Sequence, residues 1–141
     1  MVKRVTPPEA AALLADGWSY VDVRSIPEFE AGHPTGAFNV PLLHFGNGRM
    51  SPNPDFQRVL SSNFGKDAKI VVGCKAGGRS LQAAGLLEAA GYKSVVDMRG
   101  GFHGERDAFG RVACAGWAES SLPVEASAAA EKTYSVLAGK R

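Results

Sequence analysis

The feature that most constrains the fold is an alternation of β-branched runs with helical segments. Ile70-Val71-Val72 is an uninterrupted apolar run, typical of a strand that is covered on both faces. The next segment carries an apolar stripe at positions i, i+3, i+4 and i+7, made by Ala83, Leu86, Leu87 and Ala90. A second strand pattern follows at 94–98. Strand, helix and strand in this order predict an α/β domain with a mainly parallel sheet.

The rest of the chain fits the same plan. Thr6 and Glu9 have the spacing of a capping box that opens a helix, and Gly17 lies where this helix is expected to end. The other expected elements are strands at 20–23 and 37–40, a helical turn at 27–30, a long loop at 46–54 and a helix from 53 to 60. The alanine-rich tail predicts a helix at about 125–138.

Length and composition indicate one globular domain over residues 1–141. Hydrophobic residues make up 45% and charged residues 21%, which excludes wholesale disorder. The net charge of +2 gives no reason to expect a nucleic acid or membrane partner. The longest apolar run, at 10–15, is far below the roughly 20 residues that span a bilayer. Two cysteines are too few for a secreted disulfide scaffold, so we expect a cytoplasmic protein.

The strand ends predict where a site lies. In parallel α/β sheets, ligands bind at the carboxyl ends of the strands. These ends fall at 22–24, 73–74 and 98–100. Three stretches far apart in the sequence are therefore expected to meet at one edge of the sheet, with Cys74 in the middle.

The segment Cys74-Lys75-Ala76-Gly77-Gly78-Arg79-Ser80 lies between a buried strand and a helix N-terminus. Gly77 and Gly78 permit a tight curl in which main-chain N–H groups form an anion-binding nest, and the helix adds its positive end. A cysteine held there is expected to be a reactive thiolate, with Lys75 and Arg79 adding positive charge unless either side chain points outward. The alternative is an inert core cysteine at a strand end. The adjoining Gly-Gly-Arg loop favours catalysis.

This loop is similar to the active-site loop of rhodanese-family sulfurtransferases. Four further segments resemble family motifs in the same order: Asp22-Val23-Arg24 at a strand end, the run from Glu28 to Pro41 (E-F-E-A-G-H-P-T-G-A-F-N-V-P), Gly100-Gly101-Phe102, and Gly116-Trp117 with Leu122-Pro123-Val124. The segment Asn53-Pro54-Asp55-Phe56 resembles plant and bacterial single-domain members. The likeness runs from Thr6 to about Val124.

The resemblance implies a three-layer α/β/α fold around a central five-stranded parallel sheet. It also implies that Cys74 attacks the outer sulfur of a donor such as thiosulfate, releases sulfite and becomes a persulfide. The acceptor is then cyanide or a thiol, with thioredoxin and glutathione as candidates. The expected substrate-binding residues are Lys75, Ala76, Gly77, Gly78, Arg79, Ser80, Arg24 and Arg99. No cofactor is implied. His33, His44 and His103 lack metal-ligand spacing, so we expect no metal.

Two other functions remain open. The spacing from Cys74 to Arg79 is C-x4-R, whereas related dual-specificity phosphatases carry a longer C-x5-R loop, so a phosphatase is disfavoured. Rhodanese-like arsenate reductases resemble the same single-domain group, and the loop count does not separate them. A third hypothesis is a module that binds or relays sulfur to partner proteins.

The chain departs from the family pattern by an insertion at about 103–115, which separates Phe102 from Trp117. Arg99, Arg106 and Arg111 could hold an anionic donor or an acceptor there, or the insertion is a solvated loop whose charges pair with each other. Cys114 is either a resolving thiol for Cys74 or an incidental small residue.

Two residues near the strand ends are expected to be structural. Asp22 is expected to orient Arg24 or to cap the neighbouring loop. His33 is expected to be a hydrogen-bonded loop residue rather than a base.

Overall fold

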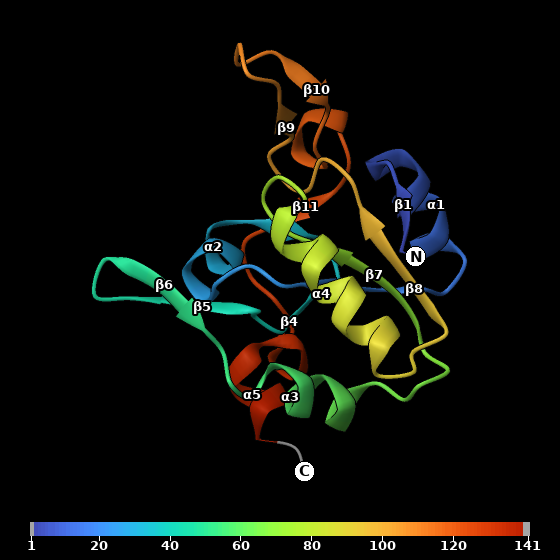
Figure 1. Ribbon diagram of the computed structural model, residues 1–141, viewed down its shortest axis with the longest axis vertical. Helices are drawn as coiled ribbons and strands as arrows, with labels where there is room; N and C mark the ends of the chain where they lie inside the picture. The colour runs from blue at the N-terminus through green and yellow to red at the C-terminus, as the bar shows by residue number, and fades with distance from the viewer. Residues whose placement is uncertain (1, 140–141) are drawn as a thin grey trace.

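A five-stranded parallel sheet forms the centre of the protein in a computed structural model, which describes residues 2–139 (Figure 1). Its strands lie in the order β1 (Lys3–Val5), β8 (Ser94–Met98), β7 (Lys69–Gly73), β2 (Ser19–Asp22) and β4 (Phe38–Asn39). All four neighbouring pairs are parallel. The predicted α/β fold with a parallel five-stranded sheet is therefore confirmed.

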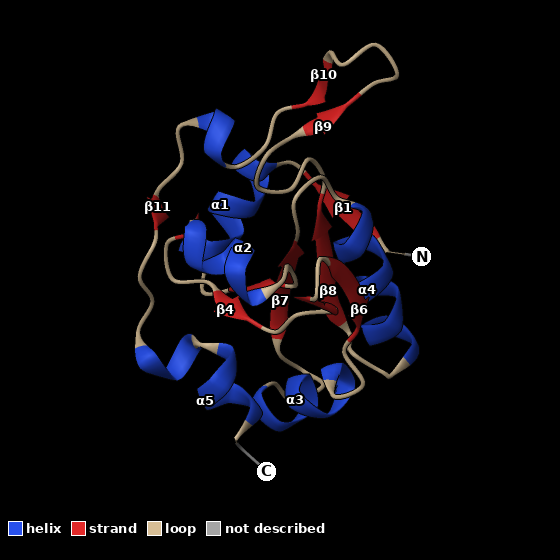
Figure 2. Cartoon of the chain, turned by 90° about the vertical axis from the view of Figure 1, so that its left-hand side faces the viewer, coloured by secondary structure: helices blue, strands red, loops and turns tan. Residues whose placement is uncertain are grey.

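Helices cover both faces of the sheet and complete three layers (Figure 2). Helices α1 (Pro7–Ala15) and α2 (Ile26–Ala31) pack on one face, in a cluster that includes Val71. Helices α3 (Phe56–Asn63), α4 (Gly78–Ala89) and α5 (Tyr134–Ala138) lie on the other face, in a cluster with Ile70 and Val72. The alternation of these three strand residues between the two clusters is the expected consequence of the strand period of two.

Local sequence signals explain where the helices begin. The predicted capping box is present, since the Glu9 N–H donates to Thr6 Oγ1 and the Thr6 N–H donates to Glu9 Oε1. Helix α4 begins after Gly77, whose φ of +109° is accessible to glycine at little cost. Its predicted apolar stripe is partly wrong, because Leu86 is 44% exposed. The buried residues of α4 are Ser80, Ala83, Ala84 and Leu87.

Two segments that the sequence predicts as loops form hairpins. The expected loop at 46–54 is wrong, because β5 (Leu43–Gly46) pairs with β6 (Arg49–Pro52). The turn is Asn47-Gly48, and both residues have positive φ, as a two-residue hairpin turn requires. The segment that the sequence predicts as an insertion forms a second hairpin from β9 (Glu105–Arg106) and β10 (Val112–Cys114), which projects from the body of the molecule (Figures 1 and 2).

The C-terminal segment differs from its prediction. In place of a helix over 125–138, β11 (Val124–Glu125) pairs with β3 (His33–Pro34), and the 3₁₀ turn η2 (Ala130–Lys132) precedes the short α5. Strand β1 has no counterpart among the predicted elements, and neither has the 3₁₀ turn η1 (Ala118–Ser120). Within residues 2–139, no helix has the length and apolar character needed to cross a membrane.

Candidate active site at the carboxyl edge of the sheet

The three predicted strand ends do meet. Asp22 pairs in register with Gly73, and the Val23 N–H donates to the Gly73 carbonyl at 3.0 Å. After β8, the chain turns back over β7, and the Phe102 N–H donates to the Cys74 carbonyl at 2.7 Å. Cys74 therefore lies between the other two strand ends, as the parallel order requires.

The Cys74 side chain combines burial with a main-chain hydrogen bond. It is 1% exposed and belongs to the apolar cluster on the α4 face of the sheet. The Gly77 N–H donates to Cys74 Sγ at 3.1 Å. The sulfur is thus buried, as an inert cysteine would be, and it also accepts a main-chain N–H, as the predicted nest requires.

The remaining loop N–H groups are available to an anion. Those of Lys75, Ala76 and Gly78 have no acceptor among the described residues. Lys75 and Ala76 are exposed. The Ser80 hydroxyl donates to the Gly77 carbonyl at 3.4 Å and so links the first turn of α4 to the loop.

A second turn, at 100–103 after β8, binds the carbonyl groups of the cysteine loop. Besides the bond from Phe102, the His103 N–H donates to the Lys75 carbonyl at 2.9 Å. A Cβ on Gly101 would lie 2.5 Å from the Cys74 carbonyl oxygen, and Gly101 has a φ of +60°. Glycine is needed at 101 because the two turns approach so closely.

Arg79 is beside the cysteine loop, but a carboxylate already occupies its guanidinium. Its Nη1 and Nη2 donate to the two carboxylate oxygens of Glu28 at 2.7 and 3.0 Å. The Ser25 N–H and hydroxyl also donate to Glu28, which completes a capping box at the start of α2. Burial opposes ionisation, but the Arg79 and Ser25 hydrogen bonds outweigh it and lower the pKa of Glu28 to about 2.

Arg24 is buried, and its guanidinium binds groups at the carboxyl end of β2. It is 1% exposed, its guanidinium donates to Asp22 at 2.7 Å, and the same Nη2 donates to the Gly32 carbonyl at 2.6 Å. Its guanidinium also lies 4.5 Å from the centre of the Phe102 ring. The predicted role of Asp22 in orienting Arg24 is confirmed. The guanidinium joins β2, α2 and the 100–103 turn.

Arg99 and the insertion carry surface ion pairs. Arg99 pairs with Glu105 at 3.1 Å and Arg106 with Glu119 at 2.6 Å. Arg111 pairs with Asp107 at 3.4 Å. The interpretation that these charges pair with each other is confirmed. The part of Arg99 in substrate binding stays a prediction.

Cys114 and His33 are the two remaining candidates from the sequence. Cys114 is partly exposed and free, and its Sγ lies 3.7 Å from the Arg99 carbonyl, against the strand end of β8. His33 is buried, its Nδ1–H donates to the Phe29 carbonyl at 2.7 Å, and its Nε2 lies 3.1 Å from a carboxylate oxygen of Glu125. His33 is therefore a hydrogen-bonded structural residue, as expected.

The sequence analysis did not identify the Arg4–Asp97 pair or the pairing of Glu28 with Arg79, both of which lie next to the cysteine loop. Arg4 on β1 donates to the buried Asp97 at 2.8 Å, and a Cβ on Gly77 would lie 3.0 Å from Arg4 Nη2. Burial raises the pKa of Asp97, while the nearby Ser80 hydroxyl and the Arg4 guanidinium oppose this. Glu28 could have been found from the capping-box spacing of Ser25 and Glu28, whereas Arg4 follows from no local signal. Among residues 2–139, no group of three or more His, Cys, Asp or Glu side chains is arranged to hold a metal.

Comparisons with known proteins agree on one family. Residues 6–107 match the family model described as Rhodanese-like domain. The chain is 42% identical over 114 residues to "Thiosulfate sulfurtransferase 16, chloroplastic" of Arabidopsis thaliana, a match that covers 81% of this chain and 85% of that protein. It is 36% identical over 99 residues to "Protein HIGH ARSENIC CONTENT 1, mitochondrial" of the same plant, covering 70% of this chain and 59% of that protein.

A solved structure supports the same assignment of fold. The crystal structure of Rv0390 from M. tuberculosis superposes with a TM-score of 0.74 at 26% sequence identity. The superposition covers 89% of this chain and 98% of that one. The likeness therefore extends over nearly all of the architecture described above.

Proposed function

Because this chain belongs to the rhodanese-like family and is an enzyme of the sulfurtransferase type, we propose that it transfers a sulfane sulfur through a persulfide on Cys74. The proposed donor is thiosulfate or a similar small anion. The proposed acceptor is cyanide or a thiol, with glutathione and thioredoxin as candidates. A cytoplasmic location stays a prediction.

The proposed chemistry needs only one nucleophile. The Cys74 thiolate attacks the outer sulfur of thiosulfate, a new S–S bond forms at Sγ, and the S–S bond of the donor breaks as sulfite leaves with the electron pair. Cyanide or a thiolate then attacks the outer sulfur of the persulfide. Thiocyanate or a new persulfide leaves, and the Cys74 thiolate returns. No net oxidant or reductant is consumed.

The observation that carries this proposal is the set of main-chain N–H groups around Cys74. The Gly77 N–H already donates to Sγ, and those of Lys75, Ala76 and Gly78 have no acceptor among residues 2–139. Preorganised N–H groups stabilise a negatively charged atom without reorganisation, as in an oxyanion hole. A persulfide places its negative charge one atom beyond Sγ, where such N–H groups can reach it.

The burial of Cys74 adds a condition. Its side chain is 1% exposed, so a donor needs a path to Sγ, and we place that path beside the exposed residues Lys75 and Ala76. The 100–103 turn binds the carbonyls of Cys74 and Lys75 and makes no hydrogen bond to the N–H groups of Lys75 and Ala76. Donor entry from that side fits an anion that the same N–H groups then bind.

Intact mass after brief exposure to thiosulfate tests the proposal. The parent protein is expected to gain one sulfur atom that cyanide removes. Cys74→Ser is expected to gain none, and Cys114→Ser, which alters the other cysteine, is expected to behave as the parent does. A gain that persists in Cys74→Ser, or no gain in the parent, would contradict a persulfide on Cys74.

Arsenate reduction is a second candidate, since a 36% identical relative carries the name HIGH ARSENIC CONTENT 1. It would use the same Cys74 thiolate, with an external thiol supplying the electrons. Parallel assays with thiosulfate and with arsenate plus glutathione separate the two functions. Rapid transfer to thioredoxin with slow cyanide turnover would instead favour a sulfur relay between proteins.

A further inference from the structure

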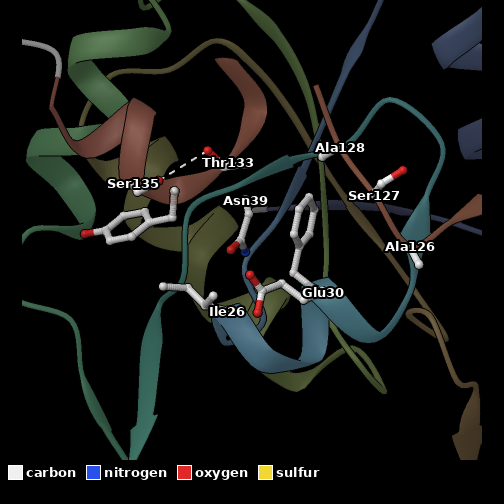
Figure 3. Close-up of a pocket in the computed structure, with 10 residues that line it drawn as sticks. Ile26, Glu30, Asn39, Ala126, Ser127, Ala128, Thr133 and Ser135 are labelled. Carbon is white, nitrogen blue, oxygen red and sulfur yellow. Dashed lines mark hydrogen bonds between the residues drawn. The ribbon is translucent and has the colours of Figure 1, made fainter. Parts of the chain in front are cut away.

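We propose that this protein has a second binding site, for a primary ammonium group on a short apolar chain, in the pocket where Asn39 and Glu30 face the C-terminal segment. The pocket has a volume of about 300 Å³ and lies between α2, the edge strand β4 and residues 126–135 (Figure 3). Its volume is within the range of small-molecule sites. It does not include Cys74.

Asn39 lines this pocket and carries a buried acceptor without a partner among the described residues. Its Nδ2 donates to the carbonyls of Asp22 and Arg24 at 3.0 and 3.1 Å. Because both partners are carbonyl oxygens, the amide orientation is fixed and Oδ1 must be the atom on the other side. Oδ1 is buried and has no hydrogen-bond partner among the described residues, although Asn39 is 1% exposed. A buried acceptor without a donor is costly, so a donor from a ligand would be well placed here.

Glu30 supplies the charge. It is exposed on α2, lines the same pocket and has no ion-pair partner within residues 2–139. In Figure 3, its carboxylate and the Asn39 oxygen point toward the same space. Two acceptors, one of them anionic, recognise a cation that carries N–H donors.

The hydroxyl groups at the rim also favour a donor. Thr133 Oγ1 donates to the Ala130 carbonyl at 2.8 Å, so its lone pairs remain to accept. Ser135 Oγ lies 3.4 Å from Thr133 Oγ1. An ammonium group has three N–H donors, which matches one carboxylate, one amide oxygen and one hydroxyl.

Beside the hydroxyls of Ser127 and Tyr134, four apolar side chains line the pocket and account for the carbon chain. Ile26 and Phe29 contribute from α2, and Ala126 and Ala128 contribute from the C-terminal segment. These side chains leave room for a short aliphatic tail but present no further charge. A bare inorganic cation would leave this apolar surface uncovered.

The site is separate from the cysteine loop. Glu28 and Glu30 are two residues apart on one helix, so their side chains point to opposite sides. Glu28 faces Arg79 at the cysteine loop, whereas Glu30 faces the pocket. The proposal therefore does not depend on persulfide chemistry.

Titration of the ¹⁵N-labelled full chain with n-butylammonium chloride tests the site. The largest shifts are expected at the Asn39 side-chain amide and in residues 126–135. Glu30→Gln should raise the Kd at least fivefold, while Glu131→Gln, which removes a carboxylate outside the pocket lining, should leave it unchanged. The unfolding midpoint of each variant verifies that it is folded.

Two further probes separate charge from hydrogen bonding. Tetramethylammonium has the charge without N–H donors, and 1-butanol has the chain without the charge. Both are expected to bind at least fivefold more weakly than n-butylammonium. Equal binding of tetramethylammonium, shifts spread over the surface, a Kd unchanged in Glu30→Gln, or no binding at 50-fold excess over protein would each overturn the proposal.

Discussion

The cysteine loop and the insertion hairpin both follow strands of the central sheet at the same edge, yet they are held in opposite ways. The edge around Cys74 is fixed by buried groups: Arg24 is 1% exposed and binds Asp22 and the Gly32 carbonyl. The hairpin formed by β9 and β10 is held by ion pairs at the surface, such as Arg106 with Glu119. Arginine occurs in both regions, but its surroundings differ.

This difference teaches that position at a strand end is not enough to indicate a site. A group contributes to chemistry at this edge when several elements fix it. β7, α4 and the 100–103 turn all hold the loop that contains Cys74. The hairpin, by contrast, makes its ion pairs with residues of the segment at 99–119 itself. Experiments that perturb matched residues in the two regions test this contrast.

The largest expected effect is on stability. Arg24→Ala leaves the Asp22 carboxylate buried without its partner, and breaking a buried pair in this way costs about 3–5 kcal/mol of the free energy of unfolding. Arg106→Ala removes a solvated pair and is expected to leave the free energy of unfolding within error. Urea unfolding of both variants measures the difference.

Arg24→Lys guards against an uninformative result if Arg24→Ala does not fold. It retains the charge but loses the paired donor geometry, so an intermediate loss of stability is expected. Similar losses in Arg24→Ala and Arg106→Ala would show that the two regions are held alike.

The next effect is on catalysis. Gly77→Ala forces a residue with a Cβ into a φ of +109° and against Arg4, so the loop is expected to shift and withdraw the N–H from Sγ. Loss of one such donor lowers kcat by about 100-fold in comparable sites. Thiosulfate–cyanide turnover measures this effect.

Gly110→Ala is the matched control in the hairpin. Gly110 also has a positive φ, +78°, but a Cβ there meets no atom within 4 Å. The backbone strain is similar, and kcat is expected to stay at the parent value. An equal fall of kcat in both variants would place the hairpin in the catalytic step.

The fold was largely predictable because its signals are local. The apolar run at 70–72, the capping box of Thr6 and the glycine that opens α4 each act within a few residues, and together they fix the element order. Strand β1 was missed because its three residues carry no periodic pattern and pair with β8, over 90 positions away. The hairpin at 43–52 was missed although Asn47-Gly48 is a strong turn signal.

The position of the site was predictable from the sequence, but the ion-pair partners of its arginines were not. Cys74 and its loop follow from the strand end and the glycines, whereas the partner of each arginine depends on the folded arrangement. The sequence predicts that Arg79 adds positive charge to the loop or points outward, and in the structure Glu28, 51 positions earlier, binds it. Such a pair is visible only when α2 and α4 have been placed side by side.

A smaller effect is expected in the pH dependence of stability. The pKa of Glu28 falls to about 2 in the folded protein from an ordinary value near 4.5, so its contribution is complete above pH 4.5 and is lost as the pH falls toward 2. Glu28→Gln should therefore flatten the decline in the free energy of unfolding between these values. Denaturant unfolding at pH 6, 4 and 3 measures the slope.

Glu105→Gln is the control for the pH experiment. The pKa of Glu105 is also lowered, chiefly by the hydrogen bond from Arg99, but this pair lies at the surface. Its effect on the slope is expected to be smaller than that of Glu28→Gln. A larger effect at Glu105 would reverse the ranking of the two regions.

The smallest effect is expected at Arg99, where the sequence and the structure favour different outcomes. If Arg99 binds the donor anion, Arg99→Ala raises the KM for thiosulfate several-fold. Its guanidinium is already paired with Glu105 at 3.1 Å and is solvated, so we expect a change in KM of less than twofold at 0.15 M salt. Lys75→Ala is the comparison, because Lys75 belongs to the loop itself. A larger rise in KM for Arg99→Ala than for Lys75→Ala would mean that the donor approaches over the hairpin, and that side of the edge would then be part of the site.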